Sequence, residues 1–158
     1  MTKIIKLANG VTVLTEQRTG TGKVAIGVFF KSGSMHESAA ENGLTNLMQE
    51  STQGGTATRG HDEIFEQIES AGGSLSSGTS ADGTMFSTEV IARKAEDTFA
   101  VIADVLRNPV FDPAEIDQAR DQIKQIITQS GQSPGSVAKK PSSWPRTTGY
   151  FQSTRMSM

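Results

Sequence analysis

The segment GGSLSSGTSADGTMF, residues 72–86, decides the fold. Gly72-Gly73 is a pair that ends helices, and the small polar residues after it run into Ala81-Asp82-Gly83, which has turn composition. Residues 84–91 then alternate in polarity and are rich in β-formers. The segment therefore predicts two antiparallel strands, residues 74–80 and 84–91, joined by a tight turn.

Three more strands are expected on the N-terminal side. Apolar residues alternate on both sides of Asn9-Gly10, a pattern that favours a hairpin with a two-residue primed turn. A further strand is predicted around residues 24–30, where apolar side chains of period two share one face that should meet helices: Val24, Ile26, Val28 and Phe30. The sequence thus predicts an α+β fold, a largely antiparallel sheet of four or five strands with helices on one face.

Four helices are expected, at residues 42–50, 61–71, 92–107 and from Asp112 onward. The last has Asp112 as N-cap, Pro113 at the first helical position and Glu115 three residues after the cap. Helical spacing predicts that these side chains face the core: Leu44, Leu47 and Met48 in the first helix, Ala95, Phe99, Ile102 and Leu106 in the third, Ile116, Ile123 and Ile127 in the fourth.

Composition bounds the function classes. At 158 residues with 35% hydrophobic and 20% charged residues, the chain has the makeup of one globular domain. The net charge of −2 and the lack of a Lys/Arg run argue against binding to nucleic acid. No apolar run is long enough to span a membrane. With no cysteine and no apolar signal region, the compartment stays open between bacterial periplasm and cytoplasm.

A series of landmarks in chain order, from about Lys6 to Lys139, resembles the M16 metallopeptidases, the family of pitrilysin, insulin-degrading enzyme and the mitochondrial processing peptidase. Residues 72–86 are similar to the family's GGxxNAxTxxDxTxY run, with Ser76 for Asn and Phe86 for Tyr. The others are residues 7–13, Ser32-Gly33-Ser34 with Glu37 and Asn42-Gly43-Leu44, Gly55-Thr56 with Arg59, Asn108–Asp112, and Ser133–Ala138. The resemblance implies a partial M16-type, LuxS/MPP-like domain over residues 1–139, and an irregular tail over residues 140–158.

The family's zinc motif, HxxEH, falls on Asn46, Gln49 and Glu50, and its third ligand falls near Ile126. Amides are poor zinc ligands, an amide cannot accept the proton of a zinc-bound water, and Ile126 offers no donor. We therefore predict no catalytic residue and no bound zinc, and the chain resembles the non-catalytic subunit of paired bacterial M16 proteins. The only histidines, His36 and His61, lie in connecting segments and are expected to be solvated.

The best functional candidate is the strand with Ser76, Ser77, Gly78 and Thr79. The resemblance implies that this strand takes an extended peptide as an added β-strand, and small side chains let another backbone approach. An edge strand blunted by poor β-formers is the alternative structural interpretation.

The expected function is that of a subunit or fragment that pairs with a catalytic M16 subunit as a heterodimer, or forms a homo-oligomer, and contributes to peptide binding. Two alternatives remain open: an active zinc metalloendopeptidase that recruits unorthodox ligands such as Glu50 and His61, and a scaffold that associates with itself. A weak cation site at Glu50 with Glu63 or Glu66 is a further, minor possibility.

Overall fold

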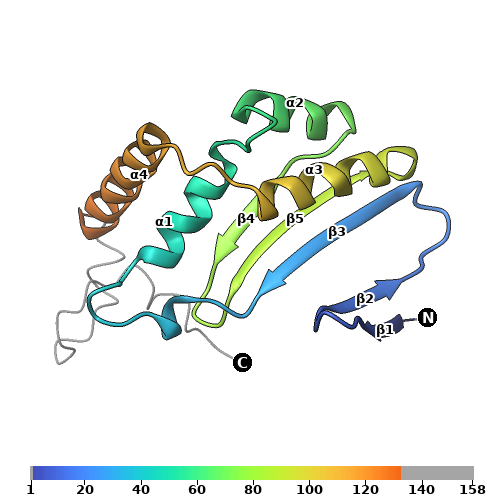
Figure 1. The fold of residues 1–158 in the computed structure, drawn as a ribbon, viewed down its shortest axis with the longest axis horizontal. Helices are drawn as coiled ribbons and strands as arrows, with labels where there is room; N and C mark the ends of the chain where they lie inside the picture. Colours follow the sequence, from blue (N-terminus) through green and yellow to red (C-terminus); the bar gives the residue numbers. More distant parts are fainter. Residues whose placement is uncertain (1, 133–158) are drawn as a thin grey trace.

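The computed structural model describes residues 2–132, in which five strands and four α-helices form an α+β fold (Figure 1). The fold class expected from the sequence is confirmed. The tail at residues 140–158 and the landmark Ser133–Ala138 lie outside the described residues. The elements are β1 Thr2–Lys6, β2 Thr12–Glu16, β3 Lys23–Phe30, α1 Leu44–Ser51, α2 His61–Ser70, β4 Ser76–Thr79, β5 Thr84–Ile91, α3 Ala95–Arg107 and α4 Pro113–Gln132, with 3₁₀ turns at Ser34–His36, Thr52–Gly54 and Ala92–Lys94.

The strands form two antiparallel sheets instead of one. β3, β5 and β4 pair in that order, and β1 pairs only with β2 among the described strands (Figure 1). The β1–β2 turn also differs from the prediction. Leu7 N donates to Val11 O at 2.8 Å, Gly10 N donates to Leu7 O at 3.0 Å, and only Gly10 in this loop has positive φ, 89°. The loop is therefore a three-residue type I turn closed by a glycine bulge, because Asn9 keeps a negative φ.

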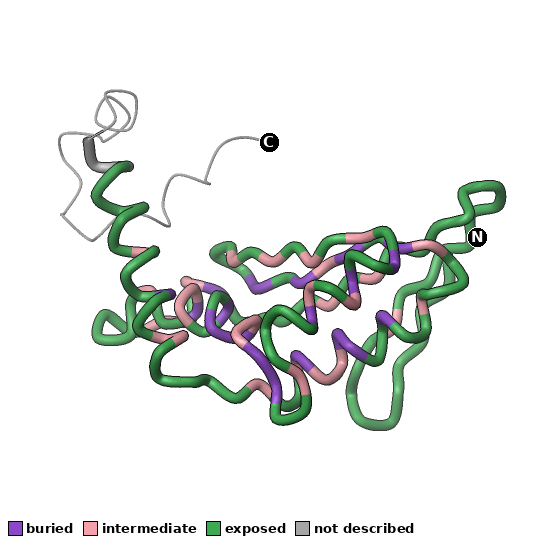
Figure 2. Tube along the Cα trace, turned by 90° about the horizontal axis from the view of Figure 1, so that it is seen from above, coloured by how far each residue is buried: buried purple, intermediate pink, exposed green. Residues whose placement is uncertain are grey.

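Helices α1, α2 and α3 cover one face of the three-stranded sheet. α1 lies against β4, α3 lies against β5, and α2 packs on α3. Buried residues gather where these layers meet, as Figure 2 shows along the trace. The cluster of Ile64 and Ile68 from α2 with Val101 and Val105 from α3 is at most 4% exposed. Each such side chain stabilises the fold by about 1.5–3 kcal/mol. This cluster is the centre of the core.

The predicted apolar stripe of α3 was right for Ile102, which is 3% exposed, and wrong for Phe99. Its buried residues are Thr98, Val101, Ile102 and Val105, while Phe99 is 56% exposed. The helix can bury Thr98 because the hydroxyl Oγ1 donates to Lys94 O at 2.9 Å within the same helix.

The helices cover some predicted core residues at the edge of the sheet and in α4 only in part. Val24 and Phe30 of β3 share the face of buried Phe86 and Val90, yet are 36% and 41% exposed. In α4, Ile116 and Ile123 are half-buried, whereas Ile127 is 43% exposed.

Two helix ends follow the sequence closely. Gly72, at φ 77°, closes α2 by donating to Glu69 O at 2.8 Å, and Gly73 N donates to Ile68 O at 3.2 Å, which is a Schellman motif. At the start of α4, the Asp112 carboxylate accepts from Ala114 N at 2.8 Å, as predicted for its cap. Within residues 2–132, no helix combines the length and the apolar character that crossing a membrane requires.

Candidate functional site

The N-terminus of α1 is held by a carboxylate from the preceding loop. Glu37 accepts hydrogen bonds from Gly43 N at 2.8 Å and Thr45 N at 2.7 Å, and Gly43 has φ 93°. Burial alone raises the pKa of Glu37, but these N–H donors outweigh it, so the pKa is lowered overall. The ionised side chain therefore fixes where α1 begins.

The face of α1 that meets the sheet is polar. Gln49 is 3% exposed and Thr45 is 7% exposed, while Leu44 and Met48 are 54% and 43% exposed. The prediction that Leu44 and Met48 pack inward was therefore wrong. The reason is that β4 presents a hydroxyl to this face, and a buried amide needs such a partner.

Two glutamine amides converge on that hydroxyl. Gln49 Nε2 donates to Ser77 Oγ at 2.6 Å, and Gln53 Nε2 donates to the same atom at 2.6 Å. Gln53 belongs to the 3₁₀ turn that follows α1. This fork fastens α1 to the middle of β4.

The four motif positions do not form a zinc-binding set. Asn46 is half-buried, Glu50 is exposed, and Ile126 on α4 is 42% exposed. A hydrolytic zinc site needs three donors such as imidazole or carboxylate and an open position, and these positions supply a single carboxylate. Within residues 2–132, no three His, Asp or Glu side chains lie close enough together to hold a metal ion.

His36 lies in the 3₁₀ turn before α1 and His61 is the first residue of α2, and both are exposed, as predicted. His36 Nδ1 accepts from Gly33 N at 3.4 Å. His61 Nδ1 hydrogen-bonds to Gln53 O at 2.9 Å, and its ring lies 4.5 Å from that of Phe65. His61 thus belongs to the surroundings of Gln53.

β4 is an edge strand of the described three-stranded sheet. Ser80 N donates to Gly83 O at 2.8 Å, and hydrogen-bonded pairs alternate along an antiparallel ladder. The main-chain groups of Ser77 and Thr79 therefore point away from β5. Ser76 and Gly78 are exposed on the opposite face of β4, and a Cβ at Gly78 would meet nothing within 4 Å.

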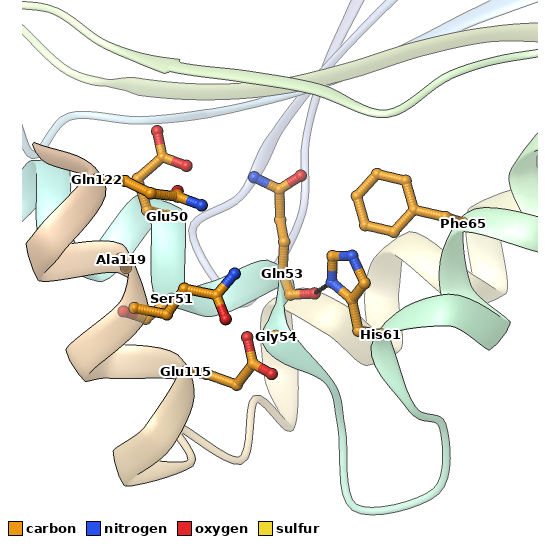
Figure 3. Close-up of a pocket in the computed structure, with 10 residues that line it drawn as sticks. Glu50, Ser51, Gln53, Gly54, His61, Phe65, Glu115, Ala119 and Gln122 are labelled. Carbon is orange, nitrogen blue, oxygen red and sulfur yellow. Dashed lines mark hydrogen bonds between the residues drawn. The ribbon is translucent and has the colours of Figure 1, made fainter. Parts of the chain in front are cut away.

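A pocket of about 170 Å³ lies beside this strand, between α1, the start of α2 and α4 (Figure 3). The sequence analysis did not predict it, because its walls come from three separate segments. The only local signal is Gly54, where a Cβ would be 3.1 Å from Cγ of Glu115. The lining residues are Glu50, Ser51, Gln53, Gly54, His61, Phe65, Glu115, Gln118, Ala119 and Gln122.

The Gly55-Thr56 and Arg59 landmark forms a clamp on α3. The carboxylate of Asp104 accepts from Asn108 Nδ2 at 2.8 Å, from Thr56 Oγ1 at 2.9 Å and from Thr58 Oγ1 at 3.1 Å, and it pairs with Arg59. These hydrogen bonds, that from Asn108 foremost, lower the pKa of Asp104 to about 2. These contacts of Asp104 with Thr56, Thr58 and Arg59 hold the loop that joins α1 to α2 against α3. Gln53 lies at the start of this loop.

The chain is similar in sequence to known proteins. The family model described as Insulinase (Peptidase family M16) matches residues 12–141. A protein named uncharacterized zinc protease from Rickettsia bellii is 30% identical over 134 residues, 85% of this chain and 32% of its own length. The mitochondrial-processing peptidase subunit beta of Dictyostelium discoideum is 34% identical over 123 residues, 77% of this chain and 26% of its own length.

Among solved structures, a peptidase M16 inactive domain from Pseudomonas fluorescens superposes with a TM-score of 0.79 at 20% identity, covering 87% of this chain and 34% of that chain. Pitrilysin superposes with a TM-score of 0.71 at 20% identity, covering 82% of this chain and 14% of that chain. The fold is thus that of an M16-type peptidase domain.

The chain belongs to the insulinase family of peptidases, family M16. It spans about a third or less of the length of these curated relatives.

Proposed function

We propose that this chain is part of a non-catalytic M16 subunit that holds an extended peptide along β4, while a metal-bearing M16 partner carries out hydrolysis. One observation carries the proposal. Gln49, to which the resemblance to the family motif assigns the place of the general base, is 3% exposed and donates its amide to Ser77 on β4. An amide cannot take a proton from water, and this one is committed to binding the sheet.

The exposed edge of β4 supports the peptide-binding part. The main-chain donors and acceptors of Ser77 and Thr79 face away from β5, and β4 pairs with no second strand within residues 2–132. An added antiparallel strand would pair with these groups, so that affinity comes from backbone hydrogen bonds and not from one particular peptide sequence.

A family precedent supports the pairing part. The relatives include proteins named as alpha and beta subunits of the mitochondrial-processing peptidase, so members of this family occur as distinct subunits. A heterodimer with a catalytic M16 subunit is the assembly we propose, and a homo-oligomer is the alternative outcome.

A proline at the free edge tests strand addition. Thr79→Pro removes one outward N–H without touching the ladder to β5, whereas Ser74→Pro places proline before the strand as the control. Fluorescence anisotropy with a labelled extended peptide should show binding weakened about tenfold or more by Thr79→Pro, about 1.4 kcal/mol, and unchanged by Ser74→Pro. Equal binding by both variants, with circular dichroism showing that each is folded, would refute strand addition at this edge.

A further inference from the structure

Two Asn-Gly pairs, Asn9-Gly10 and Asn42-Gly43, are the positions at which an asparagine of this chain can rearrange most readily. In that reaction the main-chain nitrogen of the next residue attacks the side-chain carbon Cγ and closes a cyclic imide, and glycine has no side chain to shield its nitrogen. The other two asparagines of the sequence are poorer positions. Asn108 precedes Pro109, which has no N–H, and Asn46 is half-buried within α1.

The structure gives the two Asn-Gly pairs nearly the same main-chain shape. Gly10 has φ 89° and Gly43 has φ 93°, and a Cβ at either glycine would meet nothing within 4 Å. Asn9 and Asn42 are both exposed. Neither crowding nor glycine conformation therefore distinguishes the two pairs, and the difference between them lies in what each glycine N–H binds.

The nitrogen of Gly43 is held by a carboxylate. Gly43 N donates to Glu37 Oε2 at 2.8 Å, in a partly buried contact where α1 begins. A hydrogen bond to an ionised acceptor is about twice as strong as one between neutral groups. The attack also requires that the nitrogen lose its proton, and a carboxylate beside it opposes the negative charge that this loss creates. Glu37 therefore keeps Gly43 N from acting as a nucleophile.

The nitrogen of Gly10 has no such restraint. Gly10 N donates at 3.0 Å to the neutral main-chain oxygen of Leu7, in an exposed turn. Asn9 Oδ1 accepts from Val11 N at 3.1 Å, which folds the carboxamide back along the Gly10 peptide and draws electrons from Cγ. The turn joins β1 to β2, which pair with no other described strand (Figure 1), and an isolated hairpin is at best marginally stable in water. The bond from Gly10 to Leu7 therefore opens at small cost.

We propose that Asn9-Gly10 is a site of spontaneous deamidation and that Glu37 protects Asn42-Gly43 from the same reaction. Gly10 N gives up its proton and forms a bond to Asn9 Cγ, while the bond from Cγ to Nδ2 breaks and ammonia leaves with that proton. Water then adds to either carbonyl carbon of the imide and opens the ring, giving aspartate or isoaspartate. Either product changes the net charge of the chain from −2 to −3. This inference goes beyond the proposed function and does not depend on it.

The isoaspartate product opens the β1–β2 hairpin. It routes the main chain through the former side chain and so adds a methylene group between residues 9 and 10. That addition falls inside the turn that Leu7 N closes by donating to Val11 O at 2.8 Å. Because the turn fixes the register of β1 against β2, the ladder of the hairpin is lost with it. The three-stranded sheet stays intact, since it shares no ladder with the hairpin.

Ageing of the folded full chain at neutral pH, followed by tryptic peptide mapping with mass spectrometry, measures both pairs in one sample. Asn9 should deamidate at least about tenfold faster than Asn42, a difference of about 1.4 kcal/mol between the two barriers. In concentrated urea the two rates should become similar, because only the fold distinguishes the pairs. Equal rates in the folded chain, or a rate ratio that urea leaves unchanged, would overturn the inference.

A matched pair of acid variants tests the protection. Glu37→Gln should raise the rate at Asn42 severalfold and leave the rate at Asn9 unchanged. Glu41→Gln is the control and should change neither rate, because the Glu41 carboxylate binds Ser38 and not Gly43. An unchanged rate at Asn42 in folded Glu37→Gln would show that the carboxylate does not protect it. The urea comparison uses the parent chain, so it decides the question even where Glu37→Gln fails to fold.

NMR of the aged chain tests the effect on the hairpin. Amide signals of β1 and β2 should lose their dispersion in step with isoaspartate formation, while the signals of β3, β4 and β5 stay in place. Asn9→Gln should keep its hairpin signals through the same ageing, because glutamine closes such a ring far less readily. Dispersed hairpin signals in a chain that contains isoaspartate at position 9 would refute this effect.

Discussion

Removing the hydroxyl of Ser77 should destabilise the fold more than its size suggests. Ser77→Ala deletes the hydrogen-bond acceptor of the Gln49 amide, and Gln49 is 3% exposed and cannot turn to water. Leaving such a donor unsatisfied costs about 1–3 kcal/mol, whereas half-buried Gln53 can be rehydrated at small cost. We expect a loss of about 2 kcal/mol, which lowers Tm by about 4–8 °C in a domain of this size.

Chemical denaturation of the full chain measures this loss, and two variants test its cause. Ser76→Ala, the exposed neighbour on the other face of β4, should stay within about 0.5 kcal/mol of the parent. Gln49→Leu should cost less than Ser77→Ala, because it removes the buried donor itself and Ser77 keeps its bond from Gln53. If Ser77→Ala were as stable as Ser76→Ala, the fork between α1 and β4 would not exist in solution.

Three further predictions concern metal, packing and pH. The chain purified without chelators should retain less than about 0.1 equivalent of zinc by elemental analysis, and about one equivalent with chelator-sensitive proteolysis would contradict the non-catalytic assignment. Gly73→Ala should destabilise by about 1–3 kcal/mol in urea, since its Cβ would lie 2.4 Å from Glu89 O, whereas Gly78→Ala, with nothing within 4 Å, should not. Folding lowers the pKa of Asp104 from 3.8 to about 2, so the stability that the ionised carboxylate provides is present above about pH 4 and is lost as the pH falls from about 4 to 2. In Asp104→Asn, the midpoint of urea unfolding should depend less on pH between about pH 4 and 2. A pH dependence equal to that of the parent chain would count against the clamp.

The sequence predicted those elements whose signals are local. The Gly72-Gly73 stop, the Asp112 cap and the alternation along residues 84–91 each act within a few residues, and each is present in the structure. They need no knowledge of distant partners, because caps and turns satisfy main-chain groups nearby.

The candidate site was harder to predict because its determinants are tertiary. Hydrophobic periodicity predicted that Leu44 and Met48 of α1 face the core. In the structure the polar side of α1 faces the sheet instead, because Gln49 hydrogen-bonds to Ser77. The pocket, likewise, exists only where α4 returns to α1, bringing Glu115 beside Gly54. The β1–β2 hairpin forms a sheet of its own, and the alternation of its residues does not predict this separation.

The Gln49–Ser77 bond makes the order of evolutionary steps matter. A single change of Gln49 to glutamate would place a carboxylate at a 3% exposed position of α1, a helix that forms no ion pair within residues 2–132, and burying an unpaired charge is costly. A lineage moving toward a zinc-binding helix would therefore have to acquire its imidazoles first and the acid last. Until those ligands exist, selection for stability alone keeps the amide in place.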